Sequence, residues 1–486
     1  MEKKASKIIY VISFFEGAAV MATELCGSKL ISPYFGSSLY VWSAVIAITL
    51  GSLAAGYFYG GTLSTRENKP KTLTTLLLLA AIYMGIMPLL SNIFGPMAIQ
   101  FSLLVAVVIA ALLLLFIPMF LMGAASPVII SMLTHSHAES GKVSGTVYSV
   151  STVGGIISTF LSGFFLIPFF GIHITLIIFA SFLAFSLLIL SQKKNYFKTG
   201  LVLVVLLVLG FTSKTPSKNC IYQTDGMLGK INVIDDTIIE SNENKVIRKL
   251  LVNNVVQTEM EMDSKKSVSG YINLLDTNIF DANGAEALVL GLGGGLTSNM
   301  LINKGYHVDG VELDERIIKA AREFFFLNPK VKSFCDDARH FINLSNKQYE
   351  VVLIDVFKAE EQPVHVITSE SLDKIKSILK PGGQLIINWH GYLAGERGLG
   401  TSILLNTLKS KGFNYKLCSN SNIEDQRNIV VFAFTDKIPS ITFEINEAVI
   451  PTNLVNSDAR PLLEKYNALA NQSWRKNYLQ YYYSGN

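Results

Sequence analysis

Charged residues are missing from two long stretches of this chain. Residues 72–138 and 143–192 contain no Asp, Glu, Lys or Arg, although 16% of the 486 residues are charged. A helix that crosses a bilayer needs about 20 apolar residues, and each stretch can supply more than one such helix. Only lipid or a very large core tolerates such stretches, and their lengths favour a multi-pass helical domain in the cell membrane over residues 1–213.

Cysteine is also scarce. The four cysteines, Cys26, Cys220, Cys335 and Cys418, have neither the spacing of metal ligands nor the pattern of a disulfide framework, so we expect no metal site. The net charge of +4 is small for this length, and a nucleic-acid partner is therefore not expected.

Seven spans fit the apolar runs of the membrane domain. They are expected at about 8–28, 39–60, 73–94, 98–122, 143–169, 172–191 and 197–213, each near the length that a bilayer needs. Residues 118–134 form a candidate eighth. Glu16 and Glu24 share one face of the first span, where they either bond to neighbouring helices or form a site for an amine or a proton.

The soluble sequence begins at about residue 217 and divides in two. Residues 217–283 predict a small antiparallel β subdomain. Its short alternating strands come first, and a segment at 264–280 that carries Tyr271 follows them. Residues 284–486 alternate strands with helices and predict a Rossmann-like α/β domain. Strands are expected near 286–292, 306–312, 331–335, 350–356, 383–389, 414–418 and 429–434, with helices at 314–326 and 369–379 between them.

A glycine-rich turn follows the first strand of this α/β domain. Gly291, Gly293, Gly294 and Gly295 let the backbone approach a ligand closely, and Glu312 ends the next strand, where a carboxylate can accept hydrogen bonds from ribose hydroxyls. The turn lacks the Lys and Ser/Thr of a loop that grips a triphosphate. The pattern therefore predicts a nucleoside site.

Further acidic residues end the following strands. Asp336, Asp337 and Asp355 stand at the carboxyl ends of two strands, the edge at which a parallel sheet binds its ligand. Asp337 can accept from an adenine amino group, and Asp355 is placed to meet the reacting end of the ligand. The alternative for such residues, above all for Asp336, is that they cap the helix that follows.

The predicted nucleoside site indicates on which side of the membrane the soluble half lies. Basic residues in the short loops place the N-terminus in the cytoplasm, and seven spans would then leave the soluble half outside. Because cells keep such nucleosides in the cytosol, we expect a cytoplasmic soluble domain. A break at Pro118 or Pro127, with an eighth crossing or a re-entrant segment, would restore that placement.

These residues resemble the spermidine synthase, or polyamine aminopropyltransferase, family, which has the fold of the S-adenosylmethionine-dependent methyltransferases. The matching motifs of the soluble half are Gly293-Gly-Gly295, Val311-Glu-Leu-Asp314, Asp337-Ala-Arg339, Val351-Val-Leu-Ile-Asp355 and Leu379-Lys-Pro-Gly-Gly383. The N-terminal half resembles the membrane-fused members of the family at Gly17-Ala-Ala-Val-Met-Ala-Thr-Glu24, Phe35-Gly-Ser-Ser38 and Met122-Gly-Ala-Ala-Ser-Pro127.

The resemblance implies a role for each matching residue. The donor would be decarboxylated S-adenosylmethionine or S-adenosylmethionine, and the acceptor a small-molecule amine whose proton Asp355 removes. The residues of the donor site would include Asp336, Asp337, Ala338 and Gln223. Those of the acceptor site would include Gln257, Tyr271 and Glu360, with His365 in a lid.

One departure from the family leaves alternatives open. Leu296 stands where aminopropyltransferases usually carry an Asp that holds the amine of the decarboxylated donor. Intact S-adenosylmethionine, with transfer of a methyl or aminocarboxypropyl group, is therefore an alternative to aminopropyl transfer. A third alternative is a transporter whose nucleoside-binding domain only senses. The expected partners are the amine, the lipid bilayer and, as an open question, a second copy of the chain in a homodimer.

Overall fold

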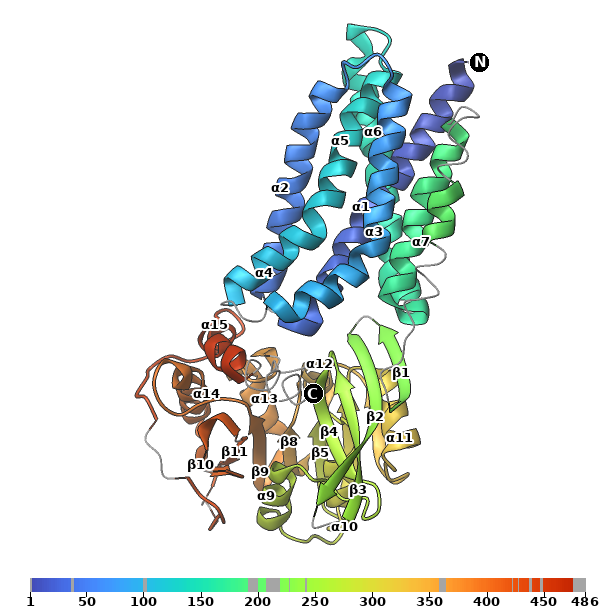
Figure 1. The fold of residues 1–486 in the computed structure, drawn as a ribbon. Coiled ribbons are helices and arrows are strands. Elements are labelled where there is room, and N and C mark those ends of the chain that lie inside the picture. The colour runs from blue at the N-terminus through green and yellow to red at the C-terminus, as the bar shows by residue number, and fades with distance from the viewer. Residues whose placement is uncertain are drawn as a thin grey trace. The chain divides into compact units, whose positions relative to one another are not determined.

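The structure is a computed structural model, and the part of the chain that it describes consists of twelve segments. These are residues 2–35, 39–98, 103–190, 200–206, 219–226, 228–240, 243–357, 364–421, 423–426, 428–436, 439–445 and 449–474. The chain divides into two compact units, Met1–Ser217 with Asp225–Gly229, and Lys218–Thr224 with Lys230–Asn486. The first consists mainly of helices and the second combines sheets with helices (Figure 1).

The first unit consists mainly of long apolar helices. They are α1 Glu2–Phe35, α2 Leu39–Leu63, α3 Lys69–Ala98, α4 Leu103–Ala111, α5 Ile117–Leu133, α6 Ser140–Leu161 and α7 Ile167–Leu190, with π-helical turns at Leu112–Phe116 and Ser162–Leu166 and a 3-10 turn at His137–Glu139. Five segments in the described ranges are long and apolar enough to cross a membrane: Ser6–Phe35, Val41–Leu63, Lys69–Gly95, Val105–Leu133 and His137–Phe185.

The seven or eight expected spans are therefore not confirmed. Four of the expected spans correspond to the first four helical segments. The fifth and sixth fall within the single segment His137–Phe185, where the backbone departs from helix at Gly171, with φ 82° and ψ 172°. The seventh, at 197–213, lies largely outside the described residues, of which 200–206 are helical.

The expected break at Pro118 or Pro127 is wrong. Both prolines lie inside α5, which follows α4 and the π-helical turn Leu112–Phe116 without a gap. Proline removes one backbone donor, and a local π-helical adjustment in the preceding turn lets the helix continue past it. The cytoplasmic placement of the second unit thus receives no support from an eighth crossing at this point.

Glu16 is held by neighbouring helices. Its side chain is 3% exposed, and its two carboxylate oxygens lie 3.4 Å from Ser126 Oγ on α5 and 3.1 Å from Ser151 Oγ on α6. Both serine hydroxyls donate to the carboxylate, which satisfies it without water. Of the two interpretations of Glu16, this arrangement favours a polar contact between helices. Glu24 is less deeply buried.

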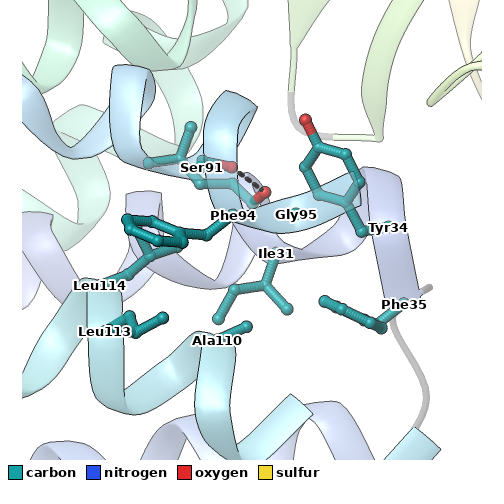
Figure 2. Close-up of a pocket in the computed structure, with 10 residues that line it drawn as sticks. Ile31, Tyr34, Phe35, Ser91, Phe94, Gly95, Ala110, Leu113 and Leu114 are labelled. Carbon is teal, nitrogen blue, oxygen red and sulfur yellow. Dashed lines mark hydrogen bonds between the residues drawn. The ribbon is translucent and has the colours of Figure 1, made fainter. Parts of the chain in front are cut away.

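The cavity in Figure 2 lies among α1, α3 and the α4 segment. Its walls are apolar and include Ile31, Phe94 and Leu114, while Ser91 Oγ beside it donates to the carbonyl of Leu30 at 2.8 Å. The cavity volume of about 10 Å³ has room for about one water molecule and is too small for an amine or a nucleoside. We therefore assign it no ligand.

The second unit begins with a four-stranded antiparallel sheet. Strands β1 Cys220–Gly226, β2 Gly229–Glu240, β3 Glu243–Val252 and β4 Val255–Glu261 lie in chain order. The pairing of β3 with β4 shifts at Leu250/Leu251, so that Gln257 on β4 is the extra residue of a bulge. Helix α9 Gly270–Asn278 then carries Tyr271. A short antiparallel sheet followed by this segment agrees with the prediction for the region.

The larger sheet of the second unit has seven strands in the order β10-β11-β9-β8-β5-β6-β7. The strands are β5 Glu286–Leu290, β6 His307–Glu312, β7 Lys332–Cys335, β8 Tyr349–Ile354, β9 Leu379–Trp389, β10 Asn414–Ser419 and β11 Ile429–Phe434. Strand β11 pairs antiparallel with both β10 and β9, and the other neighbouring strands pair in parallel. The predicted strands agree with these seven, and the α/β fold of this unit is confirmed.

Helices cover both faces of this sheet. Its apolar side chains form one cluster with α12 Ala338–Leu344, α13 Ser369–Ile378 and α14 Leu399–Ser410, and a second with α9, α10 Leu296–Asn303 and α11 Glu315–Phe324. A short helix, α15 Leu462–Tyr466, packs against α14. The chain leaves β5 toward β6 on one side, while β8 lies on the other side of β5. Open α/β sheets bind ligands at such a switch point, beside the carboxyl ends of the strands.

Close packing of α1 against α6 depends on two glycines of the first unit. A side chain at Gly154 would collide with the carbonyl of Phe14, and one at Gly17 would collide with the backbone of Ser151. Small residues let apolar helices approach until their backbones touch, which is how such helices associate in lipid. By contrast, a side chain at Gly145, also on α6, would meet no other atom within 4 Å.

We predict that Gly154→Ala destabilises the protein, because the added methyl group must push α1 away from α6. The expected loss is about 1–3 kcal/mol, the usual cost of overpacking. Thermal unfolding of the full chain in detergent measures it. Gly145→Ala on the same helix is the matched control, and its melting temperature should be unchanged or slightly higher because Ala favours a helix more than Gly does. Equal melting temperatures of the two variants would contradict the packing described for α1 and α6.

Candidate active site

The glycine turn after β5 has the backbone that its sequence predicts. Gly291, Gly293 and Gly295 have φ values of 91°, 51° and 79°. Residues other than glycine rarely adopt such positive φ values. Gly291 also lies where β5 and β8 converge, since a side chain there would collide with the carbonyl of Asp355. Gly294 donates its N–H to Thr258 Oγ1 on β4 at 2.8 Å. Thr258 therefore links the small sheet to the glycine turn.

Glu312 joins the end of β6 to the same turn. One carboxylate oxygen accepts from the N–H of Leu292 at 3.2 Å, and the other accepts from the N–H of Asp314 at 3.1 Å. A carboxylate has about four acceptor sites, and the backbone hydrogen bonds from Leu292, Gly293 and Asp314 leave one of them for a ligand hydroxyl. Burial raises the pKa of Glu312, and the backbone donors oppose that rise. The geometry fits the ribose-binding role predicted for Glu312.

One of the two acidic residues after β7 caps the next helix. Asp337 Oδ1 accepts from the N–H groups of Arg339 and His340 at 2.9 and 3.1 Å, which caps α12, and its Oδ2 lies 3.2 Å from His365 Nε2. Asp336 lies 2.8 Å from the ring of His340. Ala338 begins α12 and is buried. The capping alternative therefore applies to Asp337 itself, and its proposed contact with adenine would use the oxygen that now meets His365.

Asp355 directly follows β8 and is held by two neutral donors. Tyr271 Oη donates to its Oδ2 at 2.9 Å, and Asn388 Nδ2 on β9 donates to its Oδ1 at 2.8 Å. Burial raises the pKa of Asp355, while both hydrogen bonds act in the opposite direction. Burial also raises the pKa of Tyr271 well above its usual value, so the phenol keeps its proton. No ion pair to Asp355 is present among the residues that the structure describes.

A cleft of about 270 Å³ opens beside Asp355. Its walls include Gln257, Tyr271, Asn388, His390 and Trp474. Gln257 reaches it from the bulge on β4, a feature that re-aims side chains next to many binding sites. The structure thus brings together Asp355, Tyr271 and Gln257, three residues that the sequence resemblance assigned to one site.

Three other residues that the sequence resemblance singled out are not among the described residues that line the cleft. Gln223 is exposed on β1, where the preceding Tyr222 instead packs on Phe324 with 5.2 Å between ring centroids. Glu360 lies outside the described residues. Leu296 is 6% exposed and belongs to an apolar cluster of the small sheet, so no carboxylate is available at this position.

Sequence reasoning missed four residues of the site. Asn388, Asn428, Phe357 and Thr258 received no role, although Asn388 lies two residues before His390 on the same strand end and so shares its face of the sheet. The ring of Trp474 also belongs to the cleft wall and stacks on His390 with 4.8 Å between ring centroids. No local pattern marks Asn428, because only the pairing of β11 with β9 places it beside Asn388.

The site combines two chemical environments across the switch point. On the β6 side, glycine backbone and the Glu312 carboxylate offer hydrogen-bond acceptors and room for a polyhydroxyl ring. On the β9 side, Asp355 and Glu259 offer carboxylates in a cleft whose other walls are neutral polar, aromatic and aliphatic side chains. Such an arrangement can bind a nucleoside and a cation next to each other and accept a proton from the cation.

Comparison with known proteins agrees with this geometry. Residues 287–383 match the family described as a methyltransferase domain. The chain is 32% identical over 170 residues to an N-terminal histidine N-methyltransferase from Emericella nidulans, which covers 33% of this chain and 30% of that protein. It is 31% identical over 117 residues to a polyamine aminopropyltransferase from Vibrio vulnificus, which covers 23% of this chain and 39% of that protein.

The matched segments span only about a third of the length of these curated relatives. Among solved structures, a probable spermidine synthase from Corynebacterium glutamicum is 19% identical, with a TM-score of 0.39 over 46% of this chain and 83% of that chain. The second unit thus contains a methyltransferase-type domain at residues 287–383, and its sequence is similar to those of polyamine aminopropyltransferases.

Proposed function

We propose that this protein transfers an alkyl group from an S-adenosyl sulfonium nucleoside to the nitrogen of an amine. Aminopropyl transfer from decarboxylated S-adenosylmethionine is the first candidate, in line with the similarity to polyamine aminopropyltransferases. The observation that carries the proposal is the position of Asp355: it follows β8 at the switch point, against Gly291 of the glycine turn and at the edge of the cleft.

The donor would bind at the β6 side of the switch point. The glycine turn leaves the space that side chains would fill, and Glu312 retains an acceptor position for a ribose hydroxyl. The adenine amino group would donate to Asp337. A sulfonium nucleoside supplies a carbon that is electrophilic because the attached sulfur is positively charged.

Asp355 would prepare the acceptor for attack. An alkylamine has a pKa of about 10 and is protonated at neutral pH, so it enters the cleft as a cation that the Asp355 carboxylate attracts. Transfer of the proton to Asp355 frees the nitrogen lone pair, which forms the new N–C bond as the C–S bond breaks. The electrons of that bond remain on sulfur, which leaves as a neutral thioether. Burial of Asp355 raises its pKa and makes it a better proton acceptor.

Leu296 favours a second candidate, transfer of a methyl or aminocarboxypropyl group from intact S-adenosylmethionine. Its buried apolar side chain cannot attract the free amine of a decarboxylated donor, and it does not repel the carboxylate of the intact donor. The similarity to a histidine N-methyltransferase is consistent with this donor. In either case the acceptor atom is nitrogen and Asp355 keeps its role.

The first unit would anchor this activity to the membrane. Its five apolar helical segments are long enough to span a bilayer, and their exposed side chains include Phe160, Phe164 and Phe169. The satisfied Glu16 and the small size of the cavity in Figure 2 give no support to a transport site. We propose that the second unit faces the cytoplasm, where sulfonium nucleosides are made.

We predict that Asp355→Asn keeps donor binding and loses turnover. An amide has the same shape but cannot accept the proton, so kcat should fall about 10²- to 10⁴-fold. Calorimetry with each sulfonium nucleoside measures binding, and product analysis by mass spectrometry with a panel of amines measures turnover. Asp373→Asn, at an exposed ion pair with Lys411, is the control that should retain activity. Full activity of Asp355→Asn would refute the proposed base.

Glu312→Gln should weaken donor binding. Hydrogen bonds to a charged group contribute about 1.5–3 kcal/mol, so the dissociation constant of the preferred donor should rise about 10- to 150-fold. Titration calorimetry of both donor forms gives this number and also shows which form the protein prefers. Glu315→Gln, three residues later and exposed, is the matched control. An unchanged dissociation constant for Glu312→Gln would place the ribose elsewhere.

Tyr271→Phe should move the acidic limb of the pH–rate profile upward. Asp355 works as a base only when ionised, so activity is lost as the pH falls through its pKa, which burial has already raised. The Tyr271 hydroxyl stabilises the ionised form, and its removal raises that pKa further. Profiles of kcat/KM with one amine compare the variant with the natural protein, because protonation of the amine contributes equally to both. A limb at unchanged or lower pH would contradict the contact.

A further inference from the structure

The C-terminal segment 449–474 reaches the cleft from outside the methyltransferase-type domain at residues 287–383. It includes α15 and Trp474, whose side chain lines the cleft together with Asp355. The proposed acceptor site is therefore built partly from residues that the matched family region does not contain. Because the ends of a chain are poorly fixed unless they are bonded to the rest of the fold, the contacts of this segment decide how firm the wall at Trp474 is.

Hydrogen bonds hold the C-terminal segment on both sides of the switch point. On the β7 side, the carboxylate of Asp458 accepts from Arg339 Nη2 on α12 at 2.9 Å. On the β9 side, the amide nitrogen of Asn467 donates to the carbonyl of His390 at 3.2 Å. Asn456 is fully buried, and its side chain makes hydrogen bonds to the backbone of neighbouring segments. The segment is thus part of the folded unit.

The ring of Trp474 is also held by stacking. It lies on the ring of His390 with 4.8 Å between centroids and 25° between the ring planes. The ring of His390 is itself fixed, since it lies 4.3 Å from the ring of Phe357 and its Nε2 lies 2.9 Å from Asn428 Nδ2. These contacts oppose movement of the indole out of the cleft wall.

A rigid wall selects ligands differently from a flexible one. The side chain of Trp474 has two rotatable bonds, whereas Gln257 and Glu259 in the same cleft have more and can swing aside for a ligand. A stacked indole cannot do so without losing its contact with His390. A pocket discriminates by single methylene groups where its wall does not yield.

We propose that Trp474 is a specificity-determining residue whose indole limits the length of the amine that the cleft accepts. The reacting nitrogen lies at Asp355, and the carbon chain of the acceptor runs along the wall toward the indole. Amines that end before the indole fit the cleft, and longer ones meet it. This inference rests on the proposed transfer to an amine and identifies the residue that selects the length of that amine.

The test compares straight-chain amines from n-propylamine to n-octylamine. Each carries one ammonium group, so its attraction to the two carboxylates of the cleft, Asp355 and Glu259, is constant along the series. The full chain in detergent is saturated with the thioether 5′-methylthioadenosine, and calorimetry gives the dissociation constant of each amine. In the natural protein the affinity should rise about fourfold per buried methylene group until the chain meets Trp474, and then fall.

Trp474→Ala should move the length of tightest binding upward by about two carbons, because the chain can enter the space of the indole. At about fourfold per methylene group, the affinity for the longest amines relative to n-propylamine should rise about 10- to 20-fold over the natural protein. Values of kcat/KM with the preferred donor should follow the same shift. The dissociation constant of the donor should stay unchanged, which shows that the variant is folded.

Two further variants accompany this measurement. Leu469→Ala changes an exposed side chain of the same segment that does not line the cleft, and it should keep the natural length preference. Trp474→Phe keeps a ring against His390 but vacates less space, so it should move the preference in the same direction by a smaller amount. Partition of the amines into detergent affects all variants equally and cancels in the comparison.

An identical length preference in the natural protein and in Trp474→Ala would overturn the inference. If Trp474→Ala does not fold, an unchanged preference in Trp474→Phe overturns it equally. Failure of the proposed function has a separate signature, which is the absence of binding of either sulfonium nucleoside in the donor titration or of every amine in the series.

Discussion

The site depends on the approach of two parallel strand ends. The N–H of Asp355 donates to the carbonyl of Leu290 at 2.8 Å, and the N–H of Gly291 donates to the carbonyl of Val311 at 2.8 Å. These bonds continue the sheet to its edge, where the chain must turn away on both sides of β5. Only glycine fits at 291, because a side chain would occupy the place of the Asp355 carbonyl. The proposed donor region and the Asp355 carboxylate are consequently held next to each other by backbone hydrogen bonds.

A buried carboxylate without a cation has further consequences. Asp355 is stabilised by the hydroxyl of Tyr271 and the amide of Asn388, both neutral donors, so it can attract an ammonium ion and still take up a proton. The direction of these hydrogen bonds passes through Asn428 to His390.

The two units follow different packing rules. In the first, helices are apolar on most sides and come together through glycines such as Gly17 and Gly154, while the buried Glu16 is satisfied by two serines. In the second, apolar side chains lie on both faces of a sheet and polar groups gather at one edge. This difference is visible in the composition, because five helical segments of the first unit are apolar enough to cross a membrane, whereas the apolar side chains of the second unit gather in clusters on the faces of the sheet.

The sequence by itself determined the strands of the large sheet, the glycine turn and the acidic strand ends, because alternation, glycine and position after an apolar run are local properties. It was less successful where the result depends on distant contacts. Asp337 serves as a helix cap as well as a strand-end acid, Pro118 lies in an uninterrupted helix beside a π turn, and Gln223 is exposed. Only tertiary structure decided that Asn388, Asn428, His390 and Trp474 share one cleft, since β9, the antiparallel strand β11 and the C-terminal segment meet through pairing and packing that no local pattern records.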